Sequence, residues 1–142
     1  MYSKRFPTGY RLNEQFAHSY ILREEIGSGG YGFVMVATRR DSSVDVAVKF
    51  IIRKKVPSHA WVQDSKLGRH PTEIWLLSRI RHPNIADFLE YFEDDVYYYL
   101  VRLMVRTTFG VAQLLWKGSR ASWFPLGRET RSRSRWSLYV KE

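Results

Sequence analysis

Three glycines near the start of the chain have the spacing of a loop that could hold phosphate groups. Gly27, Gly29 and Gly32 form the pattern Gly-x-Gly-x-x-Gly between two runs rich in β-branched and aromatic residues. Glycines in such a turn let backbone N–H groups approach phosphate oxygens that side chains would otherwise block. The pattern is equally typical of an ordinary hairpin turn, so its context must decide between the two.

The residues after the glycines exclude two common nucleotide-binding loops. Phe33 to Val36 continue as a strand-like run, whereas a dinucleotide-binding fold requires a helix at this point. The loop also lacks the Lys-Ser/Thr pair that ends a Walker loop. What remains is Gly-x-Gly-x-x-Gly-x-Val, ending at Val34, with the lysine of Val-Ala-Val-Lys 15 residues further on at Lys49.

A lysine that binds phosphate needs a fixed partner, because its flexible stem otherwise loses rotamer entropy on binding. Glu73 is the candidate, because it shares one helical face with Leu77 and Ile80, and that face is expected to bury against a sheet. A simpler interpretation is that Glu73 is an acidic first-turn residue favoured by the helix dipole. Both interpretations can hold together.

The elements that would position these residues follow from the periodicity of the sequence. Runs rich in β-branched and aromatic residues predict strands at residues 20–26, 33–38, 44–52, 85–92 and 96–105, and apolar residues at helical spacing predict one helix at 71–81. The expected fold class is therefore α+β, a five-stranded antiparallel sheet with one packed helix, followed by a basic C-terminal tail.

Composition narrows the class of protein further. The chain has 142 residues, 44% hydrophobic and 26% charged, which suits one globular domain with an ordinary core. No run approaches the roughly 18–20 apolar residues of a membrane span, so the cytoplasm, or alternatively the nucleus, is the expected compartment. The absence of cysteine excludes disulfides, thiolate metal sites and a cysteine nucleophile. The net charge of +9 is concentrated at the C-terminus, where residues 105–142 hold 8 Lys and Arg against 2 Asp and Glu.

Several segments taken together resemble the kinase lobe of the PAS-domain serine/threonine kinases, in a fungal-type version. Besides the glycine loop and Val-Ala-Val-Lys, these are residues 48–56, 61–68, 71–74 and 81–85. The match covers about residues 19–103. It implies the N-terminal, ATP-binding lobe of a protein kinase, in which the lysine reaches the α- and β-phosphates of ATP and a helix glutamate holds it.

The resemblance assigns the residues of an ATP site one by one. The glycine loop would cover the phosphates, Val34 and Ala47 would sandwich adenine, and Lys49 would bind phosphate while paired with Glu73. The full expected site is Ile26, Gly27, Gly29, Gly32, Val34, Ala47, Lys49 and Glu73.

The resemblance ends at Leu103. Arg102 stands at the gatekeeper place, no acidic hinge residue follows, and the chain contains no His-Arg-Asp loop, no Asp-Phe-Gly and no Ala-Pro-Glu. Asp87-Phe-Leu and Arg40-Asp41 are look-alikes on the wrong elements. The chain alone is therefore expected to be catalytically incompetent, with no catalytic and no metal-binding residue. It is expected to bind ATP, with its magnesium, weakly if at all.

The predicted organisation is an N-terminal extension at 1–18, a kinase N-lobe-like domain at 19–104 and a basic tail at 105–142 that is expected to be poorly ordered. Three interpretations of the tail stay open. It binds nucleic acid through its arginines and tryptophans, it is a partner-binding extension, or it was never selected to fold with the lobe, as after a frameshift or a retained intron.

Two other functions remain as alternatives to the kinase interpretation. One is a non-catalytic, kinase-derived interaction module whose protein partner covers the floor of the lobe, where Phe88, Leu100 and Leu103 are expected near bare apolar surface. The other is a basic protein that binds nucleic acid through its tail.

Overall fold

The structure, a computed structural model, describes residues 5–81, 87–106 and 112–113. Its centre is an antiparallel five-stranded sheet in the order β1-β2-β3-β7-β6. The strands of this sheet are β1 (Tyr20–Gly29), β2 (Gly32–Arg39), β3 (Asp45–Ile52), β6 (Phe88–Glu93) and β7 (Tyr97–Leu103). The predicted α+β architecture with a five-stranded antiparallel sheet is confirmed.

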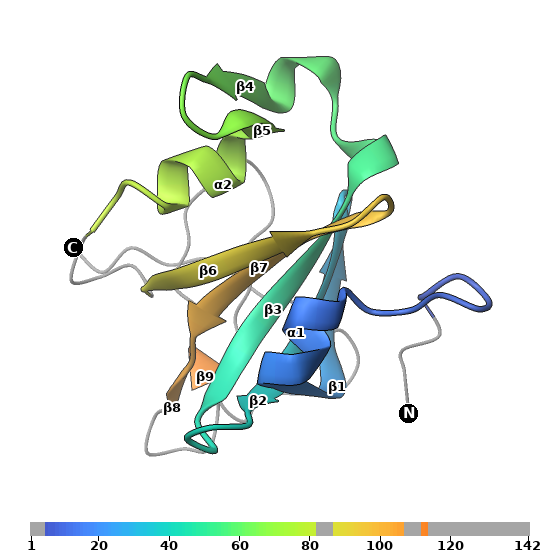
Figure 1. Cartoon of the computed structure of the whole chain (residues 1–142), viewed down its shortest axis with the longest axis vertical. Coiled ribbons are helices and arrows are strands. Elements are labelled where there is room, and N and C mark those ends of the chain that lie inside the picture. Colours follow the sequence, from blue (N-terminus) through green and yellow to red (C-terminus); the bar gives the residue numbers. More distant parts are fainter. Residues whose placement is uncertain (1–4, 82–86, 107–111, 114–142) are drawn as a thin grey trace, which may run out of the picture.

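Smaller elements surround the sheet (Figure 1). They are the helices α1 (Glu14–Ser19) and α2 (Thr72–Leu77), the 3-10 turns η1 (Arg53–Lys55) and η2 (Ser58–Ala60), the hairpin β4 (Trp61–Asp64) with β5 (Gly68–Pro71), and the short pair β8 (Val105–Arg106) with β9 (Ala112–Gln113). In Figure 1, α1 lies in front of the sheet, and α2 lies with the β4–β5 hairpin at the top.

The sheet is buried on both faces along its central strands. Strands β2, β3 and β7 are buried at nearly every position, which explains why their sequences are continuous apolar runs rather than strict alternations. Successive side chains of each strand still point to opposite faces. The sheet therefore separates two hydrophobic clusters.

The larger cluster lies on the face covered by the N-terminal segment. Phe16 of α1 is fully buried and packs beside Tyr20, Phe50 and Tyr99 of the sheet. Periodicity did not predict α1, although Asn13 gives a capping signal, because its side chain accepts a hydrogen bond from the Phe16 N–H. Six helical residues are too few for an apolar stripe to be recognised.

The smaller cluster lies on the opposite face, beneath α2. Ile74 and Leu77 of the helix pack there with Ile51, Tyr98 and Leu100 of the sheet. Leu100 is only 1% exposed, so the expectation that it borders bare apolar surface is wrong. Its position in the middle of β7, under the helix, encloses it.

The helix is shorter than the spacing predicts, because α2 ends at Leu77 rather than at residue 81. The Ser78 hydroxyl donates to the Trp75 carbonyl oxygen, which competes with continued helical bonding. Ile80 therefore lies beyond the helix and is 44% exposed. The sequence predicted that Ile80 shares a buried helical face with Glu73 and Leu77, and this prediction is wrong.

The polar stretch between β3 and α2 contains a hairpin that periodicity did not predict. Strands β4 and β5 have four residues each, too short for a reliable alternation. Their turn is built by Asp64, which accepts from the backbone N–H groups of Lys66 and Leu67, and by Gly68, whose φ of 75° favours glycine.

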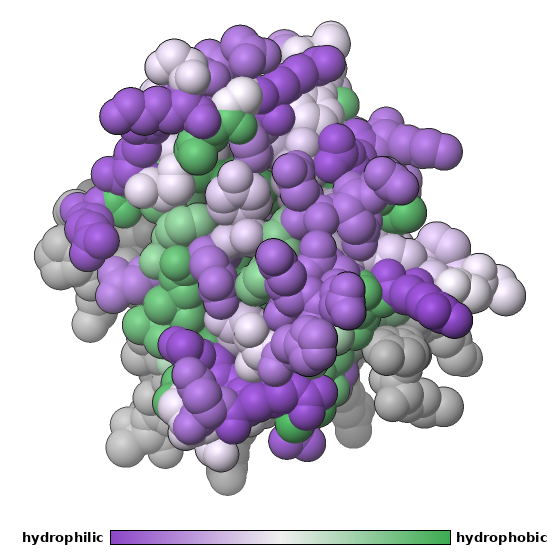
Figure 2. Space-filling view, viewed as in Figure 1, coloured by the Kyte–Doolittle hydropathy of each residue, from purple (hydrophilic) through white to green (hydrophobic). Residues whose placement is uncertain are grey.

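The surface in Figure 2 is mainly hydrophilic around the hairpin at the top, with an apolar area at the left, over β6 and β7. Within the described residues, no helix has the length and hydropathy needed to cross a membrane. Most of the basic tail, residues 107–111 and 114–142, lies outside the described residues, and with it the expected nucleic-acid and partner contacts of the tail.

Candidate functional site

An ion pair joins the central strand of the sheet to the helix above it. The Lys49 ammonium on β3 lies 2.9 Å from Oε1 and 3.0 Å from Oε2 of Glu73, in the first turn of α2. The two side chains are only 10% and 14% exposed. The predicted pairing of these residues is confirmed, and both side chains are largely buried.

Burial changes how readily both partners carry charge. Desolvation lowers the pKa of Lys49, and the nearby Glu73 carboxylate opposes that change. Desolvation likewise raises the pKa of Glu73, opposed by Lys49. Each charge therefore depends on the other for its stability. A third charge that binds here, such as a phosphate, changes the pKa values of both groups directly.

The packing of α2 aims Glu73 at the sheet. Ile74 and Leu77 are buried in the smaller cluster, so one side of the helix is fixed against β3 and β7. Glu73 lies one turn before Leu77 on that side, which brings its carboxylate over Lys49. The apolar contacts of two side chains thus place the carboxylate.

The glycine loop forms the tip of the β1–β2 hairpin. Gly27 pairs with Val34 and Gly29 pairs with Gly32, so the turn is made by Gly30 and Tyr31. A Cβ on Gly32 would clash with the backbone carbonyl of Phe50 on the neighbouring strand. The third glycine of the motif is therefore required by the close approach of two strands, with or without a ligand.

The two residues expected to sandwich adenine lie on the same face of the sheet as Lys49. Val34 is opposite Lys49 in the β2–β3 register, and Ala47 is two positions before Lys49 on β3. Both are buried, at 3% and 2% exposure. Ile26, the eighth expected residue, is half-buried near the end of β1. The structure therefore gathers the valine, the alanine, the lysine and the glutamate on one side of the sheet.

A second cation shares this face. Arg102 on β7 is opposite Ala47 in the strand register and is 5% exposed. Burial lowers its pKa to about 10, against the raising effects of Glu73 and Asp87. Its positive charge lowers the pKa of both Lys49 and Glu73. The face thus holds two buried cations around one carboxylate.

The two sequence look-alikes of kinase motifs lie on other elements than the Lys49–Glu73 pair. Asp87 is exposed just before β6, and Asp41 is exposed in the β2–β3 turn, where it pairs with Arg39 at 3.0 Å. In the part of the chain that the structure describes, no three His, Cys, Asp or Glu side chains gather into a group that could hold a metal ion.

Comparison with known protein families identifies this arrangement. The family model of the protein kinase domain matches residues 20–119. The chain belongs to the protein kinase family. The match includes the glycine loop, the lysine strand and the helix glutamate, and so the whole Lys49–Glu73 site.

Individual relatives are serine/threonine kinases. The chain is 38% identical over 87 residues to the PAS domain-containing serine/threonine-protein kinase of Mus musculus. This match covers 61% of this chain and 6% of that protein. It is 33% identical over 84 residues to the serine/threonine-protein kinase PSK1 of Saccharomyces cerevisiae, and this match covers 57% of this chain and 6% of that protein. It is 37% identical over 87 residues to the serine/threonine-protein kinase ppk6 of Schizosaccharomyces pombe, and this match covers 58% of this chain and 11% of that protein.

These similarities confirm the predicted resemblance to PAS-domain and fungal kinases. They also show that this chain matches a small part of each relative, between 6% and 11% of its length.

Proposed function

We propose that this chain is the ATP-binding lobe of a protein serine/threonine kinase and that by itself it transfers no phosphate to protein. The observation that carries the first half is the Lys49–Glu73 pair, with the ammonium 2.9 Å and 3.0 Å from the two carboxylate oxygens. The proposed site contains Ile26, Gly27, Gly29, Gly32, Val34, Ala47, Lys49 and Glu73.

In this proposal Glu73 holds the Lys49 ammonium in one place, so that phosphate binding requires little further ordering of the side chain. The backbone N–H groups of the glycine loop donate to the phosphate oxygens. Val34 and Ala47 offer an apolar wall for the adenine ring, and the small side chain of Ala47 leaves room for it. ATP brings magnesium with it, which would neutralise part of the phosphate charge.

The second half of the proposal rests on chemistry that these 142 residues do not contain. Phosphoryl transfer depends on metal ligands and on an aspartate that receives the hydroxyl proton, and the sequence has neither motif. Losing one preorganised electrostatic group reduces an enzyme's rate by about 10²–10³, and here the whole set is lacking. We therefore expect no turnover above background.

Nucleotide titration followed by NMR of the 15N-labelled chain tests ATP binding. We expect a dissociation constant around 1 mM for MgATP, because the phosphates face open water. Lys49→Met should weaken that binding about tenfold, as expected for one lost charged contact. Lys54→Met is the matched control, because Lys54 is exposed on η1 and outside the proposed site. Equal binding by both variants would refute the role of Lys49.

A radiolabelled-phosphate assay with magnesium, ATP and a basic serine peptide tests the absence of transfer. The expected signal equals that of a reaction without protein. Transfer that disappears in Lys49→Met would refute the proposed incompetence and would assign a catalytic role to residues beyond the lobe.

A non-catalytic interaction module is the second candidate function. The apolar area over β6 and β7 in Figure 2 favours it, and Phe88 at the start of β6 and Leu103 at the end of β7 are half-buried. A protein partner that covers this area would bind equally well to the wild-type chain and to Lys49→Met. For either function the cytoplasm is the proposed compartment, with the nucleus as the alternative.

A further inference from the structure

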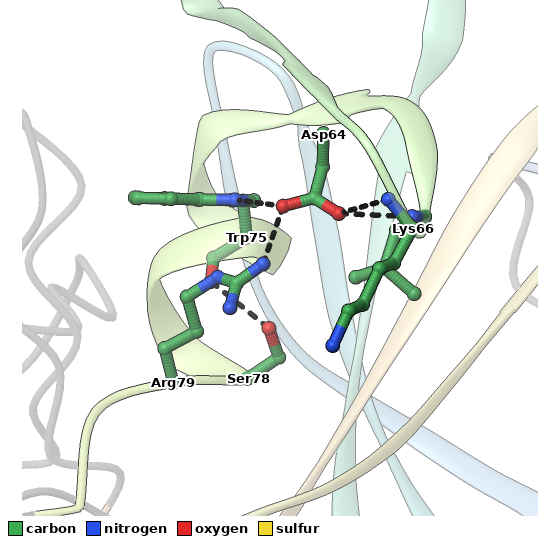
Figure 3. Close-up of polar contacts among 6 residues, drawn as sticks. Asp64, Lys66, Trp75, Ser78 and Arg79 are labelled. Carbon is green, nitrogen blue, oxygen red and sulfur yellow. Dashed lines mark hydrogen bonds and ion pairs between the residues drawn. The ribbon is translucent and has the colours of Figure 1, made fainter.

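A single carboxylate ties the β4–β5 hairpin to α2 (Figure 3). Asp64, the last residue of β4, uses its two oxygens for different purposes. Oδ1 accepts from the backbone N–H groups of Lys66 and Leu67, at 2.8 Å and 2.9 Å, and so closes the hairpin turn. Oδ2 accepts from the indole N–H of Trp75 at 3.0 Å and also receives a bond from the Arg79 guanidinium. Both of these partners belong to α2 or the turn that ends it.

The helix has few other attachments. It is six residues long, and its buried side chains are Ile74 and Leu77. An isolated helix of this length is unstable in water, so its position depends on tertiary contacts. Trp75 lies between the buried residues and follows Glu73 by two positions. A bond that fixes Trp75 therefore restricts the rotation and tilt of the turn that carries Glu73.

The contact has the features of a rigid attachment. The Asp64 side chain is 12% exposed, and the Arg79 guanidinium stacks over the Trp75 ring at 4.9 Å. The backbone N–H of Leu67, then the Trp75 indole and the Lys66 N–H, hold the pKa of Asp64 well below its usual range. The group therefore stays an acceptor for all four donors across the physiological pH range.

We propose that Asp64 is a positioning residue of the nucleotide site: its bonds to Trp75 and Arg79 make the β4–β5 hairpin a latch that holds α2, and with it Glu73, against Lys49. This inference rests on the proposed nucleotide site for its consequence, and on the Asp64 contacts for its geometry. It assigns a function to a hairpin that contains none of the proposed site residues.

Asp64→Asn removes one of the two acceptor oxygens, of which one serves the hairpin turn and the other serves the latch. An asparagine has one acceptor oxygen, so it cannot accept from the turn amides on one side and from the indole and guanidinium on the other. Trp75→Phe is the second variant, because it removes only the indole donor and leaves the turn intact. Asp41→Asn is the matched control, since Asp41 is an exposed carboxylate in an ion pair distant from α2.

Two measurements follow the helix without any nucleotide. Amide hydrogen exchange of Thr72–Leu77 should be about tenfold faster in Asp64→Asn and in Trp75→Phe, with β3 unchanged, because one charged hydrogen bond no longer resists local opening. The chain has no cysteine, so nitroxides can be attached at Leu76→Cys on α2 and Val44→Cys in the β2–β3 turn, which are 41% and 44% exposed. The distribution of distances between these labels should broaden in both variants and not in Asp41→Asn.

A third measurement tests the consequence for the site. MgATP should bind about tenfold more weakly to Asp64→Asn, whereas adenosine, which lacks phosphates, should bind as it does to the wild-type chain. General destabilisation would weaken both ligands equally.

The outcomes distinguish this inference from the proposed function. Faster exchange and broader distances in both variants support the latch, even if the wild-type chain binds no nucleotide and the proposed function fails. Changes confined to the Lys66 and Leu67 amides would overturn it, because Asp64 would then only close a turn. The inference would also be overturned if Asp64→Asn bound MgATP as tightly as the wild-type chain and that binding still depended on Lys49.

Discussion

The two faces of the sheet are held in different ways. On the face covered by α1, the buried cluster contains eleven of the described residues, most of them aromatic or β-branched. On the face beneath α2, the cluster contains five, and two buried cations and a carboxylate lie beside it. The first face is held by apolar area, and the second depends on a few directed polar contacts.

Polar contacts on the first face serve a different purpose from those on the second. The hydroxyl of Tyr10 bonds both to Asp94 and to the hydroxyl of Tyr99, which donates to Asp94 at 2.7 Å. Burial and the bond to Asp94 raise the pKa of Tyr10, so its hydroxyl keeps its proton. It fastens the N-terminal segment to the β6–β7 turn. We infer that one face provides stability through its apolar core, while on the other face the position of the helix depends on a few polar contacts around a charged pair.

The largest expected effect is on the apolar face. Phe16→Ala removes a fully buried ring that contacts Tyr20 and Tyr99 at centroid distances of 5.1 Å and 5.0 Å. We expect a loss of about 3–5 kcal/mol in the free energy of unfolding, measured with urea. Leu76→Ala, on α2 and 41% exposed, should change that free energy by less than about 1 kcal/mol. Similar losses for the two variants would contradict the place of Phe16 in the apolar core of the first face.

A smaller effect separates what the fold requires of the glycine loop from what a ligand requires. Gly32→Ala places a methyl group against the Phe50 carbonyl and should destabilise the chain by about 1–3 kcal/mol without any nucleotide. Gly30→Ala meets no atom within 4 Å and should leave stability nearly unchanged. Urea unfolding of both variants measures this. If Gly32→Ala were as stable as Gly30→Ala, the strands would not approach as closely as described.

On the charged face we expect a pH-dependent effect. Because burial raises the pKa of Glu73, its contribution to stability is fully present below the ordinary value of 4.5 and is lost as pH rises through the raised value. The wild-type chain should therefore lose stability relative to Glu73→Gln as pH rises from 4 to 8, by about 1.4 kcal/mol for each unit of difference in pKa. Glu24→Gln, at an exposed position of β1, is the control. A difference that grows in the opposite direction would contradict the assigned shift.

The smallest expected effect concerns the second cation on that face. Arg102 lowers the pKa of Lys49 and of Glu73, so Arg102→Met should raise both pKa values. Side-chain NMR titration of the 13C-labelled chain measures them. Arg53→Met is the control, because Arg53 lies on η1 over the Tyr98 ring, outside the charged trio. Unchanged titration in Arg102→Met would show that the guanidinium does not act on the pair.

Much of the site could be predicted because its signals are local in the sequence. The glycine spacing, Val-Ala-Val-Lys and the helix around Glu73 are short patterns, and the family resemblance that they carry assigns Val34, Ala47 and Lys49 to one site. The end of α2 could not be predicted from apolar spacing, because Ile80 keeps the apolar helical period although the regular helix ends at Leu77.

The latch shows the limit of such reasoning. The run Asp64 to Gly68 has the composition of a turn, and a turn is what its local hydrogen bonds form. Nothing in that run indicates that the second oxygen of Asp64 meets Trp75, 11 positions later, because this depends on how the hairpin docks on the helix.

The sequence by itself determined the antiparallel sheet and the identity of the lysine and its glutamate, because each follows from residue type and a spacing of a few positions. Only the tertiary structure decided that the N-terminal segment completes the core, that Arg102 is buried beside the ion pair, and that Asp64 joins the hairpin to the helix. These features join residues distant in the chain. Their energies come from desolvation and from directed bonds between side chains, and neither exists until the elements have packed.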